Sequence, residues 1–383
     1  MGMGQTIVFA VLPPLARKIG LPDIQVLSIF MVSAFFWVVL GPYWGRQSDI
    51  FGRKRFIISG LSGFAISMAL FASVIQLGLN NTIAGAGLYG LLLMTRSIYG
   101  IIGSGTPAAA QAYIADRTPP EKRAAGMASF SAAFGFGAMI GPAFGGAASA
   151  ISPLAPLYAV AAIAGMAVVA VILKLPEKTP PREREKQPRL SPLDDRIRAY
   201  LVYGLATSIA MAIPTQFIGF YLIDRLQLSD GQALQYVGIA LSAAAMASLF
   251  SQLVLVQRFS LPPHTLMKFG PMILCVGHFI VAIATDIGPV VFGMLLSGLG
   301  AGMVMPGFVS GASLAVTKKE QGSVAGLSNS AAASSFILAP MLGYFLYSTD
   351  PRALFIATAA ISGLSALYVT LSNQFRVLES RRR

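Results

Sequence analysis

Apolar runs long enough to form membrane-crossing helices recur along the whole chain, and short polar segments separate them. A helix needs about 20 apolar residues to cross the hydrocarbon core of a bilayer, and twelve runs of this kind can be counted. One connection is long: residues 175–198 read LPEKTPPREREKQPRLSPLDDRIR, a mixture of proline and charge that is typical of a solvated linker. The predicted spans are centred near residues 9, 35, 66, 100, 137, 165, 210, 243, 275, 301, 334 and 363.

The two halves of the chain carry helix-breaking residues at matching positions. Four matches recur at a nearly constant separation of 198 to 201 residues, which favours a duplication of six spans. We therefore predict an all-α membrane protein with twelve transmembrane helices in two pseudo-symmetric six-helix bundles, at 1–174 and 199–383, joined by the linker 175–198. The matches are Pro13 with Pro214, Gly103 and Pro107 with Gly302 and Pro306, Gly126 with Gly326, and Pro142 with Pro340.

Composition supports this interpretation. Of the 383 residues, 55% are hydrophobic and 11% are charged. In a soluble domain, roughly a quarter of all residues are charged. A chain this apolar cannot cover a water-exposed surface with polar groups, so the soluble classes are excluded. The net charge of +13 does not indicate a nucleic-acid partner, because Lys and Arg lie between apolar runs and not on a folded face interleaved with aromatic residues.

The distribution of Lys and Arg predicts the orientation in the bilayer. The connections that follow even-numbered spans, together with the short basic C-terminal tail, hold 23 of the 28 Lys and Arg residues. Cytoplasmic loops carry such an excess. We therefore expect a multi-pass protein of the cell inner (plasma) membrane with both termini in the cytoplasm.

Groups for metal or catalytic chemistry are scarce. The chain has two histidines and one cysteine, and Cys275 lies inside an apolar run. These residues do not make up a metal site, and no Ser-His-Asp arrangement can be assembled from the sequence. We expect neither a cofactor nor an enzymatic activity.

The connection between the second and third spans reads GRQSDIFGRKR from Gly45 onward. Gly45 allows another helix to approach closely, and Asp49, one turn later, can cap a helix N-terminus or pair with a guanidinium. Gly52 permits a tight turn, and the cations that begin with Arg53 and Lys54 anchor the connection. A basic loop that serves topology alone is the simpler alternative.

The fifth span contains a glycine-rich string with one proline. Glycines at this spacing line one helix face and let a neighbouring backbone pack closely, and the proline removes a backbone hydrogen bond and bends the helix. A generic packing seam is the alternative explanation. The residues of the string are Gly137, Gly141, Pro142, Gly145 and Gly146.

With these strings in view, the chain resembles a major facilitator superfamily transporter over its whole length. The first string resembles the family's signature between the second and third helices, with Ile50 where a basic residue is usual. The second resembles the fifth-helix signature of exporters that exchange substrate for protons. The stretch from Tyr113 to Arg123 resembles the loop between the fourth and fifth helices of tetracycline-type efflux proteins.

The resemblance implies two bundles that rock about a central cavity. It also implies a charge cluster on the cytoplasmic side that acts as a conformational latch and locks the outward-facing state; plain topology anchors are the alternative. A few ion pairs in a partly wet site bias such an equilibrium by about 1 kcal/mol each. The latch residues are Gly45, Asp49, Gly52, Arg53, Lys54, Asp116, Arg117, Glu121 and Arg123.

Arg96 is the one ionisable residue clearly within a predicted span. Such residues are functional by default, and the resemblance links a basic residue here to proton handling. We assign it to proton or substrate coupling, with snorkelling to the outer headgroups as the alternative. No acid lies clearly inside a span, so either the coupling carboxylate was lost with a trimmed start, or coupling uses boundary groups such as Asp49, Asp116, Asp224 or Asp286. Without a nearby buried acid, Arg96 would suit an anionic or zwitterionic substrate.

The beginning of the chain also bears on proton coupling. The aspartate of tetracycline exporters would fall on Met1, and the first span has no basic flank, so we expect it to lack a few residues. Polar and adaptable residues on the remaining cavity-lining spans are candidates for substrate contact, although each could equally bond to a neighbouring helix. These candidates are Gln5, Thr106, Gln111, Gln216, Met303 and Asn329.

Together these observations predict a secondary active transporter. We expect a monomer in the lipid bilayer that exports small amphipathic molecules, drug-like compounds or metabolites, in exchange for protons. The alternative is an uptake permease or facilitator for a sugar or organic acid on the same fold. The fifth-span string argues against this alternative.

Overall fold

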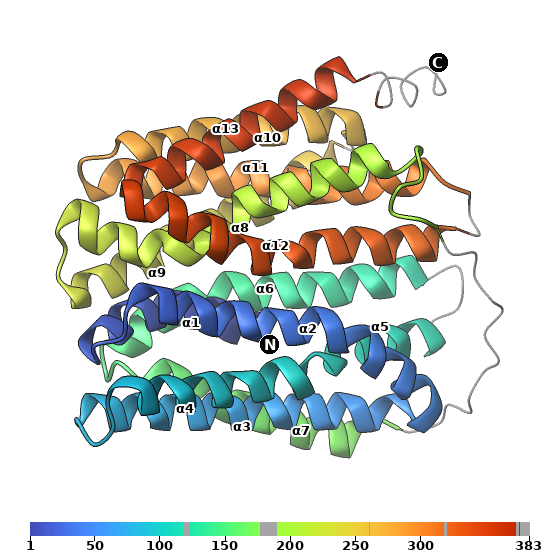
Figure 1. Ribbon diagram of the computed structural model, residues 1–383. Helices are drawn as coiled ribbons and strands as arrows, with labels where there is room; N and C mark the ends of the chain where they lie inside the picture. Colours follow the sequence, from blue (N-terminus) through green and yellow to red (C-terminus); the bar gives the residue numbers. More distant parts are fainter. Residues whose placement is uncertain (118–122, 177–189, 260, 318–319, 373–374, 376–383) are drawn as a thin grey trace. The chain divides into compact units, whose positions relative to one another are not determined.

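The computed structural model describes residues 1–117, 123–176, 190–259, 261–317, 320–372 and 375 (Figure 1). Every secondary-structure element in these ranges is a helix, and each predicted span centre falls within a helical stretch. By length and composition, ten helical stretches in the described part of the chain can cross a membrane. The predicted all-α membrane fold is confirmed.

The chain divides into two compact units. Unit 1 comprises Met1–Glu183 with Ser229–Gly238, and unit 2 comprises Arg184–Leu228 with Ile239–Arg383. The predicted linker 175–198 lies largely outside the described residues, because the structure leaves out 177–189.

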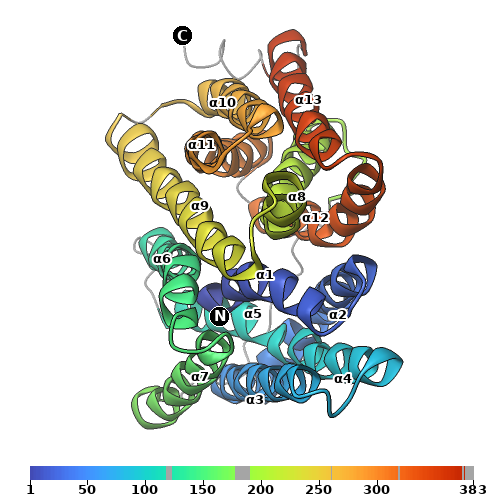
Figure 2. The same ribbon diagram turned by 90° about the vertical axis from the view of Figure 1, so that its left-hand side faces the viewer.

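In unit 1, α1 packs along α6, and α3 lies between α4 and α7 (Figure 2). The helices bury their apolar faces against one another, as in Ile7, Val11 and Phe64. The elements are α1 (Gly2–Lys18), α2 (Asp23–Phe51), α3 (Arg53–Leu79), α4 (Gly85–Ile98), η1 (Tyr99–Gly103), α5 (Gly105–Arg117), α6 (Arg123–Ser149) and α7 (Ala155–Lys174).

In unit 2, α10 packs against α11 and α13, and α8 packs against α12 (Figure 2). The Tyr203 hydroxyl donates to the carbonyl oxygen of Met267 at 3.1 Å, which satisfies a polar group inside this apolar core. The elements are α8 (Arg198–Leu226), α9 (Asp230–Phe250), η3 (Ser251–Arg258), α10 (Pro263–Ile283), α11 (Ile287–Leu314), α12 (Gln321–Thr349) and α13 (Pro351–Leu371).

Two local features differ from the sequence expectation. The expected loop between the second and third spans is a single residue, Gly52, between α2 and α3. Gly52 has φ +97°, a conformation that residues with a side chain rarely adopt, so glycine makes this turn possible. The fourth and eighth spans also contain π-helical segments, η1 and η3, where an extra residue per turn is accommodated.

Candidate functional site

A charge cluster forms where α2 ends and α3 begins. The Arg53 side chain is nearly buried, with 7% exposure of the residue. Its Nε donates to Asp116 Oδ2 at 3.3 Å, and its Nη1 donates to Ser48 Oγ at 2.7 Å and to the Gly45 carbonyl oxygen at 3.4 Å. The cluster of Gly45, Ser48, Arg53 and Asp116, here called the Arg53 cluster, therefore ties the α2–α3 turn to the end of α5.

Two neighbouring cations reach the end of α7. Lys54 Nζ donates to the carbonyl oxygen of Ile172 at 2.9 Å. Arg117 Nη2 and the Tyr113 hydroxyl both donate to the carbonyl oxygen of Pro176, at 2.8 and 3.0 Å. These contacts place a cationic side chain against the carbonyl end of a helix, where the helix dipole favours positive charge.

Some of the predicted latch residues lie outside the part of the chain that the structure describes. Glu121 lies outside the described residues, as do the side chains of Asp49 and Arg123. The structure thus brings together Gly45, Arg53 and Asp116 from the predicted latch, and the latch itself remains a prediction.

Arg96 occupies the last turn of α4, immediately before the π-helical segment η1. It is 1% exposed. Its Nη2 donates to Gln5 Oε1 on α1 at 3.0 Å, and its Cζ lies 4.5 Å from the centre of the Tyr99 ring. Its Nε and Nη1 have no hydrogen-bond partner among the described residues.

Three glycines of the fifth-span string, Gly137, Gly141 and Gly145, face α1. A side chain at Gly141 would collide with Thr6 Oγ1 and would place its Cβ 2.6 Å from the Met3 carbonyl oxygen. At Gly137 the nearest atom would be Met3 N at 3.2 Å, and at Gly145 it would be Ile7 Cγ1 at 3.4 Å. The glycine face thus allows close approach of the α1 and α6 backbones. Pro142 is buried and Gly146 is half-buried.

The six candidate substrate residues differ in burial. Gln5 is half-buried and contacts Arg96. Gln216 is 1% exposed, and both of its amide atoms are without a hydrogen-bond partner in the described structure. The other four are Thr106, buried against Gly60; Gln111, half-buried; Met303, buried against Gly270; and Asn329, exposed.

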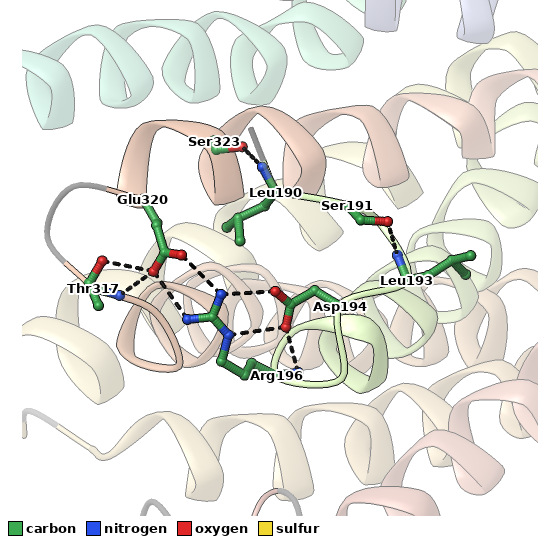
Figure 3. Close-up of polar contacts among 8 residues, drawn as sticks. All are labelled: Leu190, Ser191, Leu193, Asp194, Arg196, Thr317, Glu320 and Ser323. Atoms are coloured by element: carbon green, nitrogen blue, oxygen red, sulfur yellow. Dashed lines mark hydrogen bonds and ion pairs between the residues drawn. The ribbon is translucent and has the colours of Figure 1, made fainter. Parts of the chain in front are cut away.

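A second charge cluster, in unit 2, was not predicted from the sequence (Figure 3). The Arg196 guanidinium lies between two carboxylates, with Nη2 at 2.8 Å from Asp194 Oδ2 and 2.9 Å from Glu320 Oε1. Glu320 also accepts from the backbone N–H and hydroxyl of Thr317, at 3.0 and 2.7 Å. The sequence does indicate the bonds between Thr317 and Glu320, because the two residues have the spacing of a capping box before a helix. Thr118 and Glu121 repeat this spacing in the first half of the chain.

Hydrogen bonds from Arg196 lower the pKa of both carboxyl groups in this cluster. The pKa of Asp194 falls to about 2, and the pKa of Glu320, which also accepts from Thr317, falls to about 2. A carboxyl whose folded-state pKa is depressed stabilises the fold above its ordinary pKa, and this contribution is lost as pH falls through the folded-state pKa.

We expect Glu320→Gln to lower the melting temperature of the purified protein by a few degrees at pH 7. The difference from wild type should shrink as the pH is lowered from about 4 towards 2, because wild-type Glu320 then becomes neutral as well. Thermal unfolding in detergent across this pH range measures both quantities. Asp195→Asn is the matched control, since Asp195 is an exposed neighbour whose pair with Arg198 spans 3.5 Å. Equal melting temperatures of wild type and Glu320→Gln at pH 7 would contradict the stabilising role.

Two units of apolar helices, with charge clusters at helix ends and the buried Arg96 in α4, are the architecture of a multi-pass membrane protein. The family model of the Major Facilitator Superfamily matches residues 1–336, and the chain belongs to this family. Its members are transporters and not enzymes.

Individual proteins are similar to the whole chain or to part of it. The class G tetracycline resistance protein of Vibrio anguillarum is 30% identical over 371 residues, covering 92% of this chain and 88% of that protein. The multidrug resistance protein MdtG of Proteus mirabilis is 28% identical over 150 residues, covering 38% of this chain and 34% of that protein. The predicted resemblance to tetracycline-efflux and multidrug exporters is confirmed.

Solved structures share the fold. The nucleoside transporter NupG aligns over 96% of both chains with a TM-score of 0.74 and 12% identity. The human organic anion transporter MFSD10 aligns over 96% of both chains with a TM-score of 0.67 and 20% identity. At these identities the likeness concerns the fold alone.

Proposed function

We propose that this transporter exports small amphipathic compounds in exchange for protons, by alternating access of two six-helix bundles at 1–174 and 199–383. The observation that carries the proposal is the 30% identity, across 92% of the chain, to a protein named for tetracycline resistance. The close α1–α6 packing at the glycine string of α6 supports export, because that string resembles the signature of substrate/proton exchangers.

The Arg53 cluster supports alternating access as the mechanism. Its ion pair joins the beginning of α3 to the end of α5, and Asp116 remains partly exposed, with 30% exposure of its side chain. A partly wet pair of this kind contributes about 1 kcal/mol, which is enough to shift a two-state equilibrium and weak enough to break in each cycle. We assign the latch role to this pair, together with the other predicted latch residues.

We further propose that the protein is a monomer in the bacterial inner membrane with both termini in the cytoplasm. The excess of Lys and Arg in one set of connections supports this orientation. The charge clusters at the α2–α3 turn and before α8 and α12 would then lie on the cytoplasmic side.

Transport in liposomes tests the proposed function. The purified chain is reconstituted with a pH-sensitive dye inside and an imposed pH gradient, and tetracycline, a lipophilic cation, an organic anion and a sugar are added in turn. We expect proton movement that depends on an amphipathic compound and is absent from protein-free liposomes.

Other outcomes separate the alternatives. Compound movement without proton movement would contradict antiport and favour facilitation. Movement of the sugar into the liposomes, with no response to amphipathic compounds, would favour the permease alternative. A protonophore, which collapses the gradient, is the control for coupling.

A further inference from the structure

The guanidinium of Arg96 is a buried cation without a counter-charge in the described part of the chain. It is 1% exposed, its Nε and Nη1 have no partner, and its one hydrogen bond goes to an uncharged amide, that of Gln5. Arginine is not deprotonated in proteins. The positive charge therefore persists inside the span, and an anion would neutralise it.

The hydrogen bond to Gln5 does not account for this charge. An uncharged donor at position 96 could make the same contact with Gln5, whereas an arginine at the centre of a membrane helix costs at least about 2.5 kcal/mol on insertion scales. Nor can Arg96 carry protons itself, because its guanidinium does not release one and no described carboxylate bonds to it to receive one. What remains is a site for a negatively charged ligand.

The surroundings of Arg96 are aromatic. The Tyr99 ring lies below the guanidinium, and it packs against Trp37 and Phe64 with ring centres 5.0 and 5.2 Å apart. A ligand with an apolar body could bury that body against these rings while its anionic group meets the cation. Gln5, which is half-buried, accepts the hydrogen bond from Arg96 Nη2. The anionic group of such a ligand would displace the Gln5 amide and accept this hydrogen bond in its place.

We propose that Arg96 binds the anionic group of the transported compound, so that the substrates are amphipathic organic anions with a carboxylate or sulfonate head and an aromatic or aliphatic body. The planar guanidinium matches a carboxylate with two parallel hydrogen bonds. The proposal names the substrate class of the proposed transport function and rests on that function for its role in the cell.

Equilibrium binding of three probes with one common body tests the proposal. Radiolabelled 2-naphthoate, 2-naphthamide and 2-naphthylmethylammonium are dialysed against the full-length chain in a neutral detergent. We expect naphthoate to bind at least tenfold more tightly than the neutral or cationic probe. Arg96→Gln should abolish this preference, and Arg96→Lys should retain part of it, because lysine keeps the charge and loses the planar fork.

A second variant tests the geometry without removing the cation. In Gln5→Glu the new carboxylate takes the position that contacts Arg96 Nη2, so it should pair with the guanidinium and weaken naphthoate binding at least tenfold. Two matched controls make the same change of net charge at exposed positions: Gln76→Glu in α3 and Arg258→Gln in η3. Both controls should bind naphthoate like wild type, and size-exclusion elution verifies that each variant is folded.

Three results would overturn the assignment. Equal binding of the three probes, or naphthoate binding unchanged in both Arg96→Gln and Gln5→Glu, would remove Arg96 as the anion site. Competition by phosphatidylglycerol in nanodiscs would assign the site to a lipid headgroup and not to a substrate. The binding assay needs no transport: a chain that binds naphthoate yet moves no compound contradicts the proposed function alone, and one that exports only cations without binding naphthoate contradicts this inference alone.

Discussion

Replacing Arg53 by glutamine is expected to reduce transport at least tenfold while the amount of protein in the membrane stays near wild type. Arg53 is almost buried and donates to Asp116, Ser48 and the Gly45 carbonyl oxygen. Glutamine can keep one of these bonds and cannot keep the ion pair that links α3 to α5. Uptake of a labelled substrate into inverted membrane vesicles, normalised to protein level, measures the effect.

The partner and a neighbouring cation make this prediction specific. Asp116→Asn should cause a similar loss, and the double variant should be little worse than either single one, because both remove the same interaction. Arg55→Gln removes an exposed positive charge two residues from Arg53 and should transport normally. Normal transport by both Arg53→Gln and Asp116→Asn would show that the cluster anchors the chain and does not gate it.

The helices of this protein could be predicted because the bilayer imposes their length. Each span must satisfy its backbone hydrogen bonds internally and must carry about 20 apolar residues. Hydropathy along the chain therefore locates the helices, and every predicted centre, from residue 9 in α1 to residue 363 in α13, falls in one.

Details of backbone geometry were not accessible from hydropathy. The π-helical segments Tyr99–Gly103 and Ser251–Arg258 lie inside apolar runs, and an apolar run is the same whether a turn contains one residue more or fewer. The glycine at 52 did predict a tight turn. That the turn would be one residue long followed only from the helices on both sides.

In the candidate site, too, single residues could be predicted from the sequence, whereas the contacts between distant residues could not. Arg96 was identifiable from the sequence because an arginine inside an apolar run is conspicuous. Its contact with Gln5, 91 residues earlier, depends on how the helices of unit 1 bring the side chains of α1 and α4 together. Likewise, Arg196 and Glu320 are 124 residues apart, and no local pattern joins them although the capping-box spacing around Glu320 was readable.

The α1–α6 packing leads to the prediction with the largest expected effect on folding. We expect Gly141→Ala to lower the melting temperature by several degrees and to reduce the yield of monodisperse protein. The added methyl group would collide with Thr6 Oγ1 and lie 2.6 Å from the Met3 carbonyl oxygen. The threonine can rotate, but the carbonyl belongs to the α1 backbone, so the helices must separate. Overpacking of this kind typically costs about 1–3 kcal/mol.

A second glycine in α6 provides the matched control. A methyl group at Gly135 meets no atom within 4 Å, so Gly135→Ala should keep or slightly raise the melting temperature, because alanine favours helix by up to about 1 kcal/mol over glycine. In the Gly141→Ala background, Thr6→Ala removes one of the two colliding groups and should restore part of the loss. Equal stability of Gly141→Ala and Gly135→Ala would mean that α1 and α6 do not need this close approach, and the glycine string would then need an explanation other than packing.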